Sequence, residues 1–451
     1  MTSAQQDTRK PGFSPAQLVS GSFLMLILLG TSVLMLPIAR SGPQSPEFVT
    51  ALFTATSAVC LTGLNVVDTA SYWSHFGQAV ILLLIQIGGL GIMTLATVVS
   101  YVLAGRMGVR GRLNAAAEQR GRDFGEIRTI IWGTIGFSLA VEGIISFILF
   151  CRFFFGYHYT FGASVWQGVF HAVSAFNNAG FGLHSTNLVP FVNDVGIILP
   201  IASGIIIGGL GFPVLLELRA RCKSPHRTPP SLTLRFTLWG TGFLLLLGTV
   251  GFGAMEWNGA LAHLEPWSAV QAAFFHSVST RTAGFNSIDL SNLHSSSLLL
   301  TDFLMLIGGG SGGTAGGVKV TTAAVLVAVM VAEIRGDEQL LVGGRRIPGR
   351  IVRQAMAVFM MAFVIVVSSI MGLQILMPQF SSHEIVFETI SAFATVGLTT
   401  GITPELPDFA RVWLVCLMYA GRVGPITVVA ALAGRTNRRL YSFPVERPFI
   451  G

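Results

Sequence analysis

Residues 394–401 read ATVGLTTG, and the glycine in the middle of this stretch, Gly397, belongs to a pattern that the chain repeats. A phenylalanine lies ten residues before Gly397, a serine lies six residues before it, and a large apolar residue follows it. Three other windows share this pattern, except that Val278 replaces the serine in the third. The four windows read FTATSAVCLTGL (53–64), FHAVSAFNNAGF (170–181), FFHSVSTRTAGF (274–285) and FETISAFATVGL (387–398).

The glycines of these windows lie about a quarter of the 451-residue chain apart, which indicates internal repetition. Any one of the 52 glycines is best explained by close helix packing in a membrane. Four glycines at the same offset from a phenylalanine are not explained in that way. We therefore interpret the chain as four diverged copies of one unit that pack around a common axis.

The chain is 52% hydrophobic and only 11% charged. Its apolar runs are long enough to cross the roughly 30 Å of membrane hydrocarbon as helices. The first run lacks a small-residue cleavage site, so we expect a retained helix and not a signal peptide. The predicted fold class is an all-α polytopic membrane protein. Examples of these runs are 18–38, 79–103, 236–255 and 352–376.

The formal net charge of +7 could indicate a nucleic-acid-binding protein, but the placement of the basic residues indicates otherwise. Most of the 28 Lys and Arg fall in five segments, and the segments on the opposite side hold more Asp and Glu than Arg. The positive-inside rule places the five segments and both termini in the cytoplasm. We expect no nucleic-acid partner, and the four scattered cysteines predict neither a disulfide framework nor a zinc site. The basic segments are 1–16, 104–128, 219–235, 333–353 and 435–451.

Each window lies on the outer side between two apolar runs, so the four units are expected to be parallel repeats. The residues from the phenylalanine to the glycine are too few to cross the membrane, and they fit a short helix followed by an extended loop. The predicted architecture is four parallel helix–pore-loop–helix repeats with pseudo-four-fold symmetry around a central pore. The expected parts are a cytoplasmic N-terminus 1–16, pore unit 1 at 17–105, a linker 106–128, pore unit 2 at 129–218, a linker 219–231, pore unit 3 at 232–334, a linker 335–350, pore unit 4 at 351–434 and a cytoplasmic C-terminal tail 435–451.

Four such loops around one axis form a narrow ring of backbone carbonyls, which is how cation selectivity filters are built. Glycine permits the dihedral angles that turn carbonyls towards the axis. The partly negative C-terminal ends of the short helices favour a cation beneath the ring, and a net negative outer face concentrates cations at the entrance. The residues therefore predict a cation-conducting pore.

The stretches ATSAVCLTGLNVVDT, VSAFNNAGF, STRTAGFNS, SAFATVGLTTG and MYAGRVGPIT resemble the Trk/Ktr/HKT superfamily of potassium transporters. The resemblance covers nearly the whole chain and is closest to the bacterial KtrB-type membrane subunit. It implies potassium uptake across the bacterial inner (plasma) membrane, with K+ as the transported ion, Na+ as a candidate activator and no cofactor on this chain. It also implies a homodimer and a cytoplasmic ring of nucleotide-binding, RCK-type regulatory subunits.

By the same resemblance, each window glycine and the two residues before it form the potassium filter. All four filter positions are glycine, as in the potassium-selective members. The filter residues are Leu61, Thr62, Gly63, Asn178, Ala179, Gly180, Thr282, Ala283, Gly284, Thr395, Val396 and Gly397.

Residues 308–319 read GGGSGGTAGGVK and interrupt the last apolar run of the third unit. Each glycine costs a helix about 1 kcal/mol relative to alanine, so the sequence predicts two half-helices joined by a loop. The resemblance assigns this loop as an intramembrane gate, with Arg422 of the last unit nearby. Lys319 and Arg422 could instead extend along the membrane boundary towards the cytoplasm. The gate residues are Gly308, Gly309, Gly310, Ser311, Gly312, Gly313, Thr314, Gly316, Gly317, Lys319 and Arg422.

Two alternative functions stay open. One is transport of sodium, or sodium-coupled cation transport. The other is a remote one, an intramembrane serine hydrolase, because residues 309–313 match G-x-S-x-G around Ser311, although no histidine lies in the inner half-helices to act as a base. Arg281 is expected to brace the third filter loop through backbone bonds, and Glu142 lies within an apolar run without an assigned partner.

Overall fold

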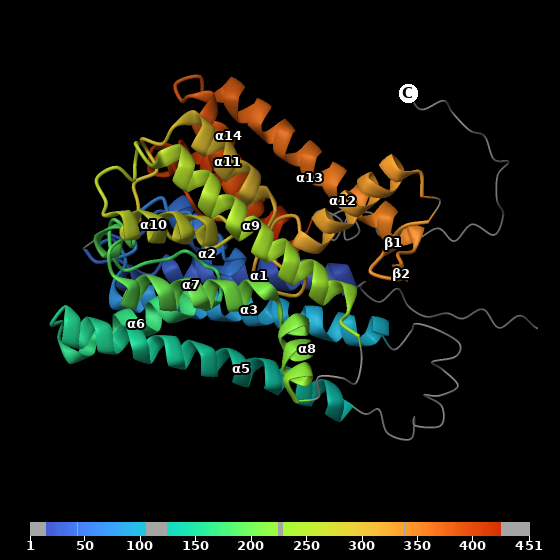
Figure 1. Ribbon diagram of the computed structural model, residues 1–451. Helices are drawn as coiled ribbons and strands as arrows, with labels where there is room; N and C mark the ends of the chain where they lie inside the picture. Colours follow the sequence, from blue (N-terminus) through green and yellow to red (C-terminus); the bar gives the residue numbers. More distant parts are fainter. Residues whose placement is uncertain (1–14, 43, 105–123, 224–228, 338, 425–451) are drawn as a thin grey trace, which may run out of the picture.

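The computed structural model describes residues 15–42, 44–104, 124–223, 229–337 and 339–424. The predicted tail 435–451, nearly all of the N-terminal segment 1–16 and most of the linker 106–128 lie outside these residues. The described part is mostly helical (Figure 1).

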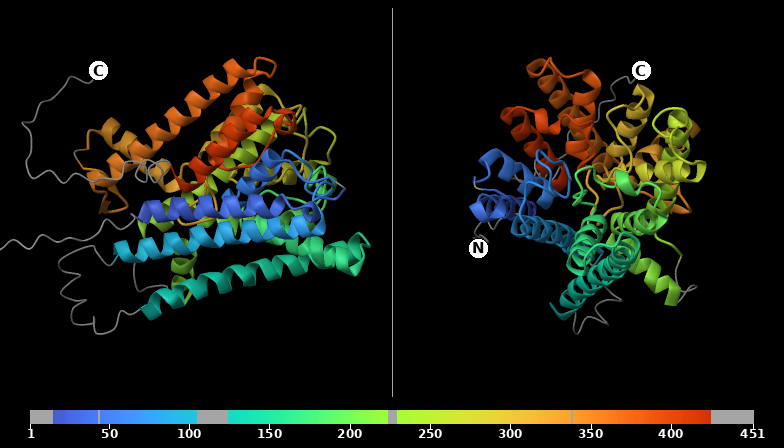
Figure 2. Two further views of the ribbon diagram at one scale, coloured as in Figure 1. Left: turned by 180° about the vertical axis from the view of Figure 1, so that it is seen from behind. Right: turned by 90° about the vertical axis from the view of Figure 1, so that its left-hand side faces the viewer.

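Each quarter of the chain follows the same order of a long helix, a short helix, an irregular loop and a further apolar helix. In the right-hand view of Figure 2, the four quarters occupy successive sectors around the middle of the molecule. The last quarter meets the first, because α15 packs against α2. The helices are α1 (Pro15–Leu34), α2 (Phe48–Cys60) and α3 (His75–Ala104); α5 (Phe124–Cys151), α6 (Phe161–Phe176), α7 (Val195–Leu210) and α8 (Phe212–Lys223); α9 (Leu232–Glu256), α10 (Pro266–Ser279), α11 (Ser295–Leu306) and α12 (Val320–Arg335); and α13 (Gly349–Leu376), α14 (Ser382–Ala394) and α15 (Asp408–Val423).

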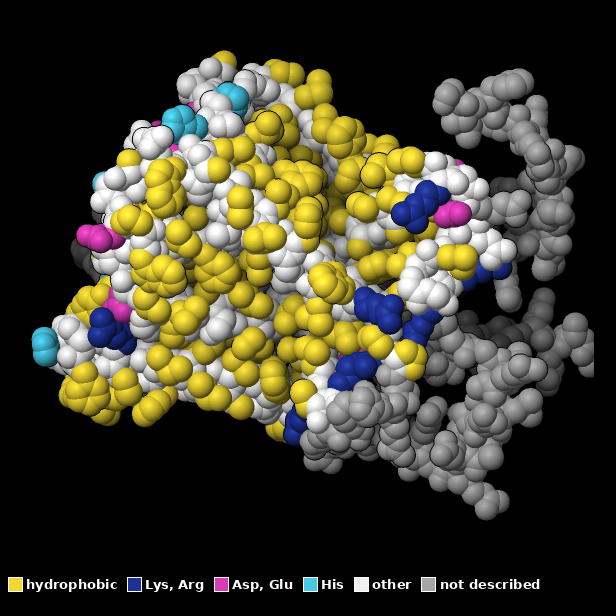
Figure 3. Space-filling view, in the orientation of Figure 1, with side chains coloured by type: hydrophobic (Ala, Val, Ile, Leu, Met, Phe, Trp, Pro, Cys, Tyr) yellow, Lys and Arg dark blue, Asp and Glu magenta, His cyan; other side chains and the backbone are white. Residues whose placement is uncertain are grey.

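A two-stranded antiparallel hairpin of β1 (Leu341–Val342) and β2 (Arg345–Arg346) connects α12 to α13. In the described residues, three helices are long and apolar enough to cross a membrane: Trp132–Gly156, Leu232–Glu256 and Gly349–Leu376. The bent pair α7 and α8 makes a fourth if it is counted as one span. Hydrophobic side chains cover the middle of the face drawn in Figure 3, and most Lys and Arg of that face lie towards the end that carries the hairpin.

Local chemistry explains where the short helices begin and end. Ser381 starts α14 with a capping box, in which its hydroxyl accepts a bond from the Glu384 amide and the Glu384 carboxylate accepts one from the Ser381 amide. Thr160 accepts a bond from an amide in the first turn of α6. The helices α2 and α14 end because the next residues, Leu61 and Thr395, adopt left-handed φ angles of 57° and 52°.

The pore unit predicted at 129–218 does not end in one straight helix, as its helix–pore-loop–helix pattern implies. The helix breaks at Gly211, and α7 and α8 meet there at an angle of 98°. Gly211 has a φ of 91°, which residues other than glycine rarely adopt. The chain therefore turns sharply, and α8 leaves the direction of α7 (Figure 1).

Candidate functional site

The loops that follow the four short helices share one backbone conformation. In each loop, the residue two positions before the window glycine and the glycine itself both have positive φ, whereas the residue between them does not. Alternation of the sign of φ turns successive carbonyls towards the same side of a chain. The φ angles are 57° and 91° at Leu61 and Gly63, 55° and 74° at Asn178 and Gly180, 71° and 72° at Thr282 and Gly284, and 52° and 92° at Thr395 and Gly397.

The window glycines contact one another in a closed ring. A Cβ built on each of them would meet the carbonyl oxygen that precedes the glycine of the next loop, so any side chain would collide with backbone. The contacts run from the first loop to the second, third and fourth and then return to the first. The distances would be 2.6 Å from Gly63 to Ala179, 2.9 Å from Gly180 to Ala283 and 2.6 Å from Gly284 to Val396, and Gly397 would overlap the oxygen of Thr62.

Hydrogen bonds from the short helices hold the loops. The amide of Gly63 donates to the hydroxyl of Ser57 at 3.0 Å, and the amide of Gly397 donates to that of Ser391 at the same distance. These are the serines that the sequence pattern places six residues before the glycine. The repeated serine therefore fixes the loop conformation in the first and last quarters.

The third loop is one residue shorter than the ungapped comparison of the windows implies. In the other three loops, the residue before the glycine donates its amide to the carbonyl six residues before the glycine, but in the third loop Ala283 donates to Ser279, which is five before it. Phe275, and not Phe274, is fully buried, as Phe53 and its counterparts Phe170 and Phe387 are. Ser279 and Phe275 therefore take the places that the sequence comparison gave to Val278 and Phe274.

A cavity of about 350 Å³ opens above the ring and is lined by residues of all four quarters, including Gly63, Gly284 and Gly397. Asp68 lies in its wall and accepts hydrogen bonds from Ser185 at 2.6 Å and from a second serine hydroxyl. Burial alone would raise the pKa of the Asp68 carboxyl, but these bonds outweigh it and hold the pKa below its usual value. The cavity therefore carries a carboxylate in its charged form.

The glycine-rich segment lies between α11, which ends at Leu306, and α12, which begins at Val320. The segment is held by the bend between α7 and α8 through backbone bonds. A Cβ on Gly211 would lie only 2.6 Å from the Ser311 carbonyl oxygen. The bonds run from the Gly310 amide to the Gly209 carbonyl (2.8 Å), from Thr314 to Gly208 (3.3 Å) and from Phe212 to Gly312 (3.3 Å).

Three basic side chains bond to carbonyls of this segment. Arg422 of α15 donates to the carbonyl of Thr314. Lys319 turns back onto the segment and donates to the carbonyl of Ala315. Arg281 donates to Gly308 at 3.4 Å and to a carbonyl of α9 at 3.2 Å, so it links the third loop to the glycine-rich segment and to α9.

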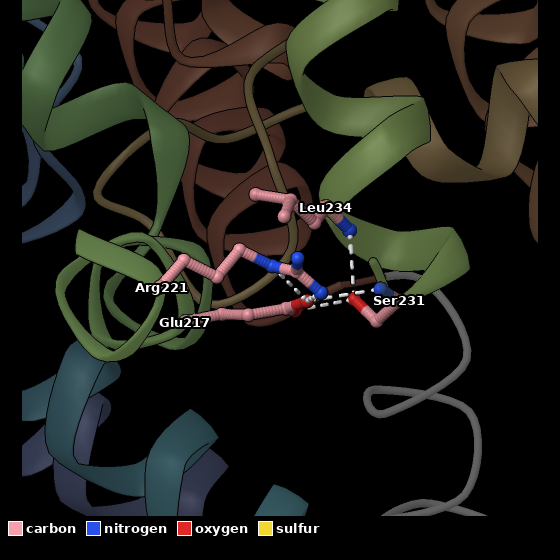
Figure 4. Close-up of polar contacts among 4 residues, drawn as sticks. All are labelled: Glu217, Arg221, Ser231 and Leu234. Carbon is pink, nitrogen blue, oxygen red and sulfur yellow. Dashed lines mark hydrogen bonds and ion pairs between the residues drawn. The ribbon is translucent and has the colours of Figure 1, made fainter. Parts of the chain in front are cut away.

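The short helix α8 is fastened to the start of α9 (Figure 4). Glu217 accepts bonds from Arg221 at 3.2 Å and from the amide of Ser231 at 2.9 Å. The hydroxyl of Ser231 also donates to Glu217 and accepts from the amide of Leu234 at 3.0 Å. The bend between α7 and α8 contacts the glycine-rich segment, and α8 is therefore also bonded to the first helix of the third quarter.

Comparison with known proteins decides the family. The family model for TrkH, a cation transport protein, matches residues 14–437. The chain belongs to the TrkH family. It is 37% identical to the "Ktr system potassium uptake protein B" of Bacillus subtilis over 97% of both chains. It is 36% identical to the "Potassium/sodium uptake protein NtpJ" of Enterococcus hirae over the full length of both.

The fold also matches the crystal structure of TrkH from Vibrio parahaemolyticus, with a TM-score of 0.72 over 95% of this chain and 86% of that one at 19% identity. As a TrkH-family member, the chain is a membrane transport protein and not an enzyme. The hydroxyl of Ser311, the residue of the alternative hydrolase hypothesis, lies 2.8 Å from that of Thr321.

Besides the register of the third loop, sequence reasoning missed two features of the site. One is the break at Gly211, for which the stretch GGLGFP at 208–213 is a usable signal, because clustered glycine and proline interrupt helices. The other is the set of partners of Glu142, which are Gln86 and Asn177. No local signal points to these partners, because they lie in other parts of the chain.

Proposed function

We propose that the protein takes up potassium ions through the centre of the ring formed by the four window glycines. The observation that carries this proposal is the closed series of contacts from Gly63 through Gly180 and Gly284 to Gly397 and back. The function named for the Bacillus subtilis relative, potassium uptake, supports the choice of ion.

In this proposal, the carbonyls of each glycine and of the two residues before it replace the hydration shell of K+. The alternating φ angles support this role, because they turn consecutive carbonyls towards the axis. The helices α2, α6, α10 and α14 act as pore helices of four parallel repeats, and their C-terminal ends stabilise the cation by their dipoles. Side chains at the filter positions can vary, since the backbone does the binding.

The glycine-rich segment 308–319 acts as the gate. Its position between the half-helices α11 and α12, and its bonds to Arg281, Arg422 and the bend at Gly211, support a defined closed conformation. Lys319 and Arg422 place positive charge next to the conduction path, and this charge opposes cations until the segment moves. Opening then requires the backbone bonds to the bend to break.

We further propose that the protein works as a homodimer in the bacterial inner membrane, with both termini in the cytoplasm and a nucleotide-binding regulatory ring beneath it. The collection of Lys and Arg at one end of the molecule supports this orientation (Figure 3). Na+ is a candidate activator or second substrate, because the Enterococcus hirae relative is named for potassium and sodium.

The test is growth at low potassium of a bacterium that lacks its own uptake systems and expresses the chain with its regulatory partner. The wild type should restore growth and Gly397→Asp should not, because the new side chain would overlap the Thr62 carbonyl in the ring. Gly162→Asp is the matched control, since its Cβ would meet nothing within 4 Å. Rescue by Gly397→Asp equal to the wild type would contradict the proposal, and rescue that needs added Na+ would favour sodium coupling.

A further inference from the structure

A buried polar triad lies behind the second loop, outside the ring itself. Glu142 of α5 is only 4% exposed, Asn177 at the end of α6 is fully buried, and Gln86 comes from α3 of the first quarter. A carboxylate at this depth in a membrane helix is costly unless it is satisfied by donors. Within the described residues, the donors bonded to Glu142 are amides and none is a cation.

The three side chains form a closed set of hydrogen bonds. The Gln86 amide nitrogen donates to both oxygens of Glu142, each at 3.1 Å. The Asn177 amide nitrogen donates to Glu142 Oε1 at 3.1 Å and to Gln86 Oε1 at 3.0 Å. Each member therefore bonds to both of the others, so a change in one alters the position of the rest.

Two adjacent glycines of α3 leave space for the triad. A Cβ on Gly89 would overlap the side-chain oxygen of Asn177, so a larger residue at 89 would displace the amide. A Cβ on the neighbouring Gly88 would likewise collide with the carbonyl oxygen of Val59 in α2. The pair of glycines thus lets α3 lie against the ends of two short helices at once.

The triad acts directly on the start of the second loop. Asn177 is the cap residue of α6 and is followed by Asn178, whose left-handed φ of 55° begins the loop. The corresponding positions in the first and fourth loops are Cys60 and Ala394, which are held by apolar packing. In the third loop, Arg281 binds carbonyls of α9 and the glycine-rich segment. At this position, the second loop is therefore the one fixed by a carboxylate. The fourth loop is bonded to a buried carboxylate further along, where Thr399 and Thr403 donate to Glu388.

We propose that Glu142 is a positioning residue for ion selectivity, which holds the second loop through Asn177 and so sets the distance of the Asn178–Gly180 carbonyls from the axis. This inference rests on the proposed filter function. Selectivity between K+ and Na+ depends on the position and freedom of carbonyl ligands. Loss of the carboxylate should let the second loop relax, and smaller ions should then be accepted more readily.

The experiment measures the ratio of K+ to Na+ uptake by the purified protein, with its regulatory partner, in liposomes. Glu142→Ala and Asn177→Ala should each lower the ratio by about tenfold, and the double variant should be no worse than either single one. Glu142→Gln should lie between, because one amide oxygen can still accept a bond. Glu256→Gln is the matched control, since it alters a buried carboxylate at the outer end of α9 and should leave the ratio unchanged.

Unchanged ratios in Glu142→Ala and Asn177→Ala would overturn the inference, provided that both elute as folded protein on size exclusion. If Glu142→Ala does not fold, Glu142→Gln and Gln86→Ala decide by the same ratio. Gly180→Ser in the same assay separates the two proposals. A changed ratio in Gly180→Ser with none in the triad variants removes only the role of Glu142, whereas no change in Gly180→Ser contradicts the filter itself.

Discussion

At the scale of single residues, the ring depends on the absence of side chains at four positions. Each window glycine combines a φ between 72° and 92° with a neighbouring carbonyl in the space of a Cβ. A residue with a Cβ would suffer both a strained backbone and a collision. Changes here should therefore displace the carbonyls of the ring and alter ion preference.

Gly63→Ser should lower the K+/Na+ uptake ratio by about tenfold, because its Cβ would lie 2.6 Å from the Ala179 carbonyl oxygen. The ratio is measured by competition between the two ions in liposomes. Gly133→Ser is the control, since its Cβ meets nothing within 4 Å. A wild-type ratio in Gly63→Ser would mean that this loop does not contact the ion.

Asp68→Asn should raise the KM for K+ by about threefold at low ionic strength and have less effect at high salt, because a charge in the cavity wall concentrates cations. The lowered pKa of Asp68 keeps the carboxylate charged through the neutral and mildly acid range. The difference from wild type should thus be the same at about pH 5 and about pH 8.

The hydrogen bonds to Asp68 also make the stability of the folded protein depend on pH. Because the folded pKa of Asp68 is depressed, the stability that these bonds contribute is present above the unfolded pKa and is lost as the pH falls through the folded pKa. The prediction for transport would be contradicted if Asp68→Asn had the same KM for K+ as the wild type at both low and high salt. Asp68 would then have no electrostatic role at the entrance.

At the scale of elements, the bend between α7 and α8 and the glycine-rich segment form one unit. Three backbone bonds join them, and Glu217 ties α8 to the start of α9. A displacement of α8 would therefore be transmitted to the segment.

Gly211→Ala should increase potassium flux a few-fold in the absence of the regulatory partner, because its Cβ would press on the Ser311 carbonyl and displace the segment. The measurement is K+ flux into liposomes that contain the chain alone. Gly242→Ala is the control, as it is exposed and its Cβ meets nothing within 4 Å. Equal flux in all three proteins would show that the bend does not hold the gate.

Deletion of residues 309–316 should raise the partner-independent flux further, since it removes most of the segment and its bonds to Arg422 and the bend. The K+/Na+ ratio should change less than the flux, because the filter loops remain. Flux at or below the wild-type level in folded protein would count against a gating role.

At the scale of the whole molecule, charge is separated along the direction of the helices. Figure 3 shows Lys and Arg mainly at the end with the hairpin, and apolar side chains across the middle. This arrangement predicts which end meets the cytoplasm. The exposed Cys222 of α8 gives a direct test, because it lies among the basic residues Arg219, Arg221 and Lys223 of that helix.

In a chain that retains Cys222 alone, a membrane-impermeant thiol reagent should label inside-out vesicles and not intact cells. A cysteine introduced by Ser291→Cys, in the cavity above the ring, should show the opposite pattern in a chain without native cysteines. Labelling of Cys222 from outside would reverse the proposed orientation.

Sequence and structure agree on the loops to different degrees. The window glycines could be grouped from sequence alone, because no side chain fits at these four positions and all four windows therefore carry glycine there. The missing residue in the third loop could not be found, since Phe274 fits the pattern and lies next to Phe275, which takes its place in the structure. Only the burial of Phe275 and the bond from Ala283 to Ser279 establish the register.

By itself, the sequence determined the apolar helices, the four repeated windows and the glycine-rich break before α12, because these depend on local composition and spacing. The tertiary structure decided the contacts between distant parts of the chain. These are the closed ring of loops, the backbone bonds between the α7–α8 bend and the glycine-rich segment, and the triad of Gln86, Glu142 and Asn177. Each arises from packing between helices, and the local sequence around a residue does not identify the residues that it contacts across a packed interface.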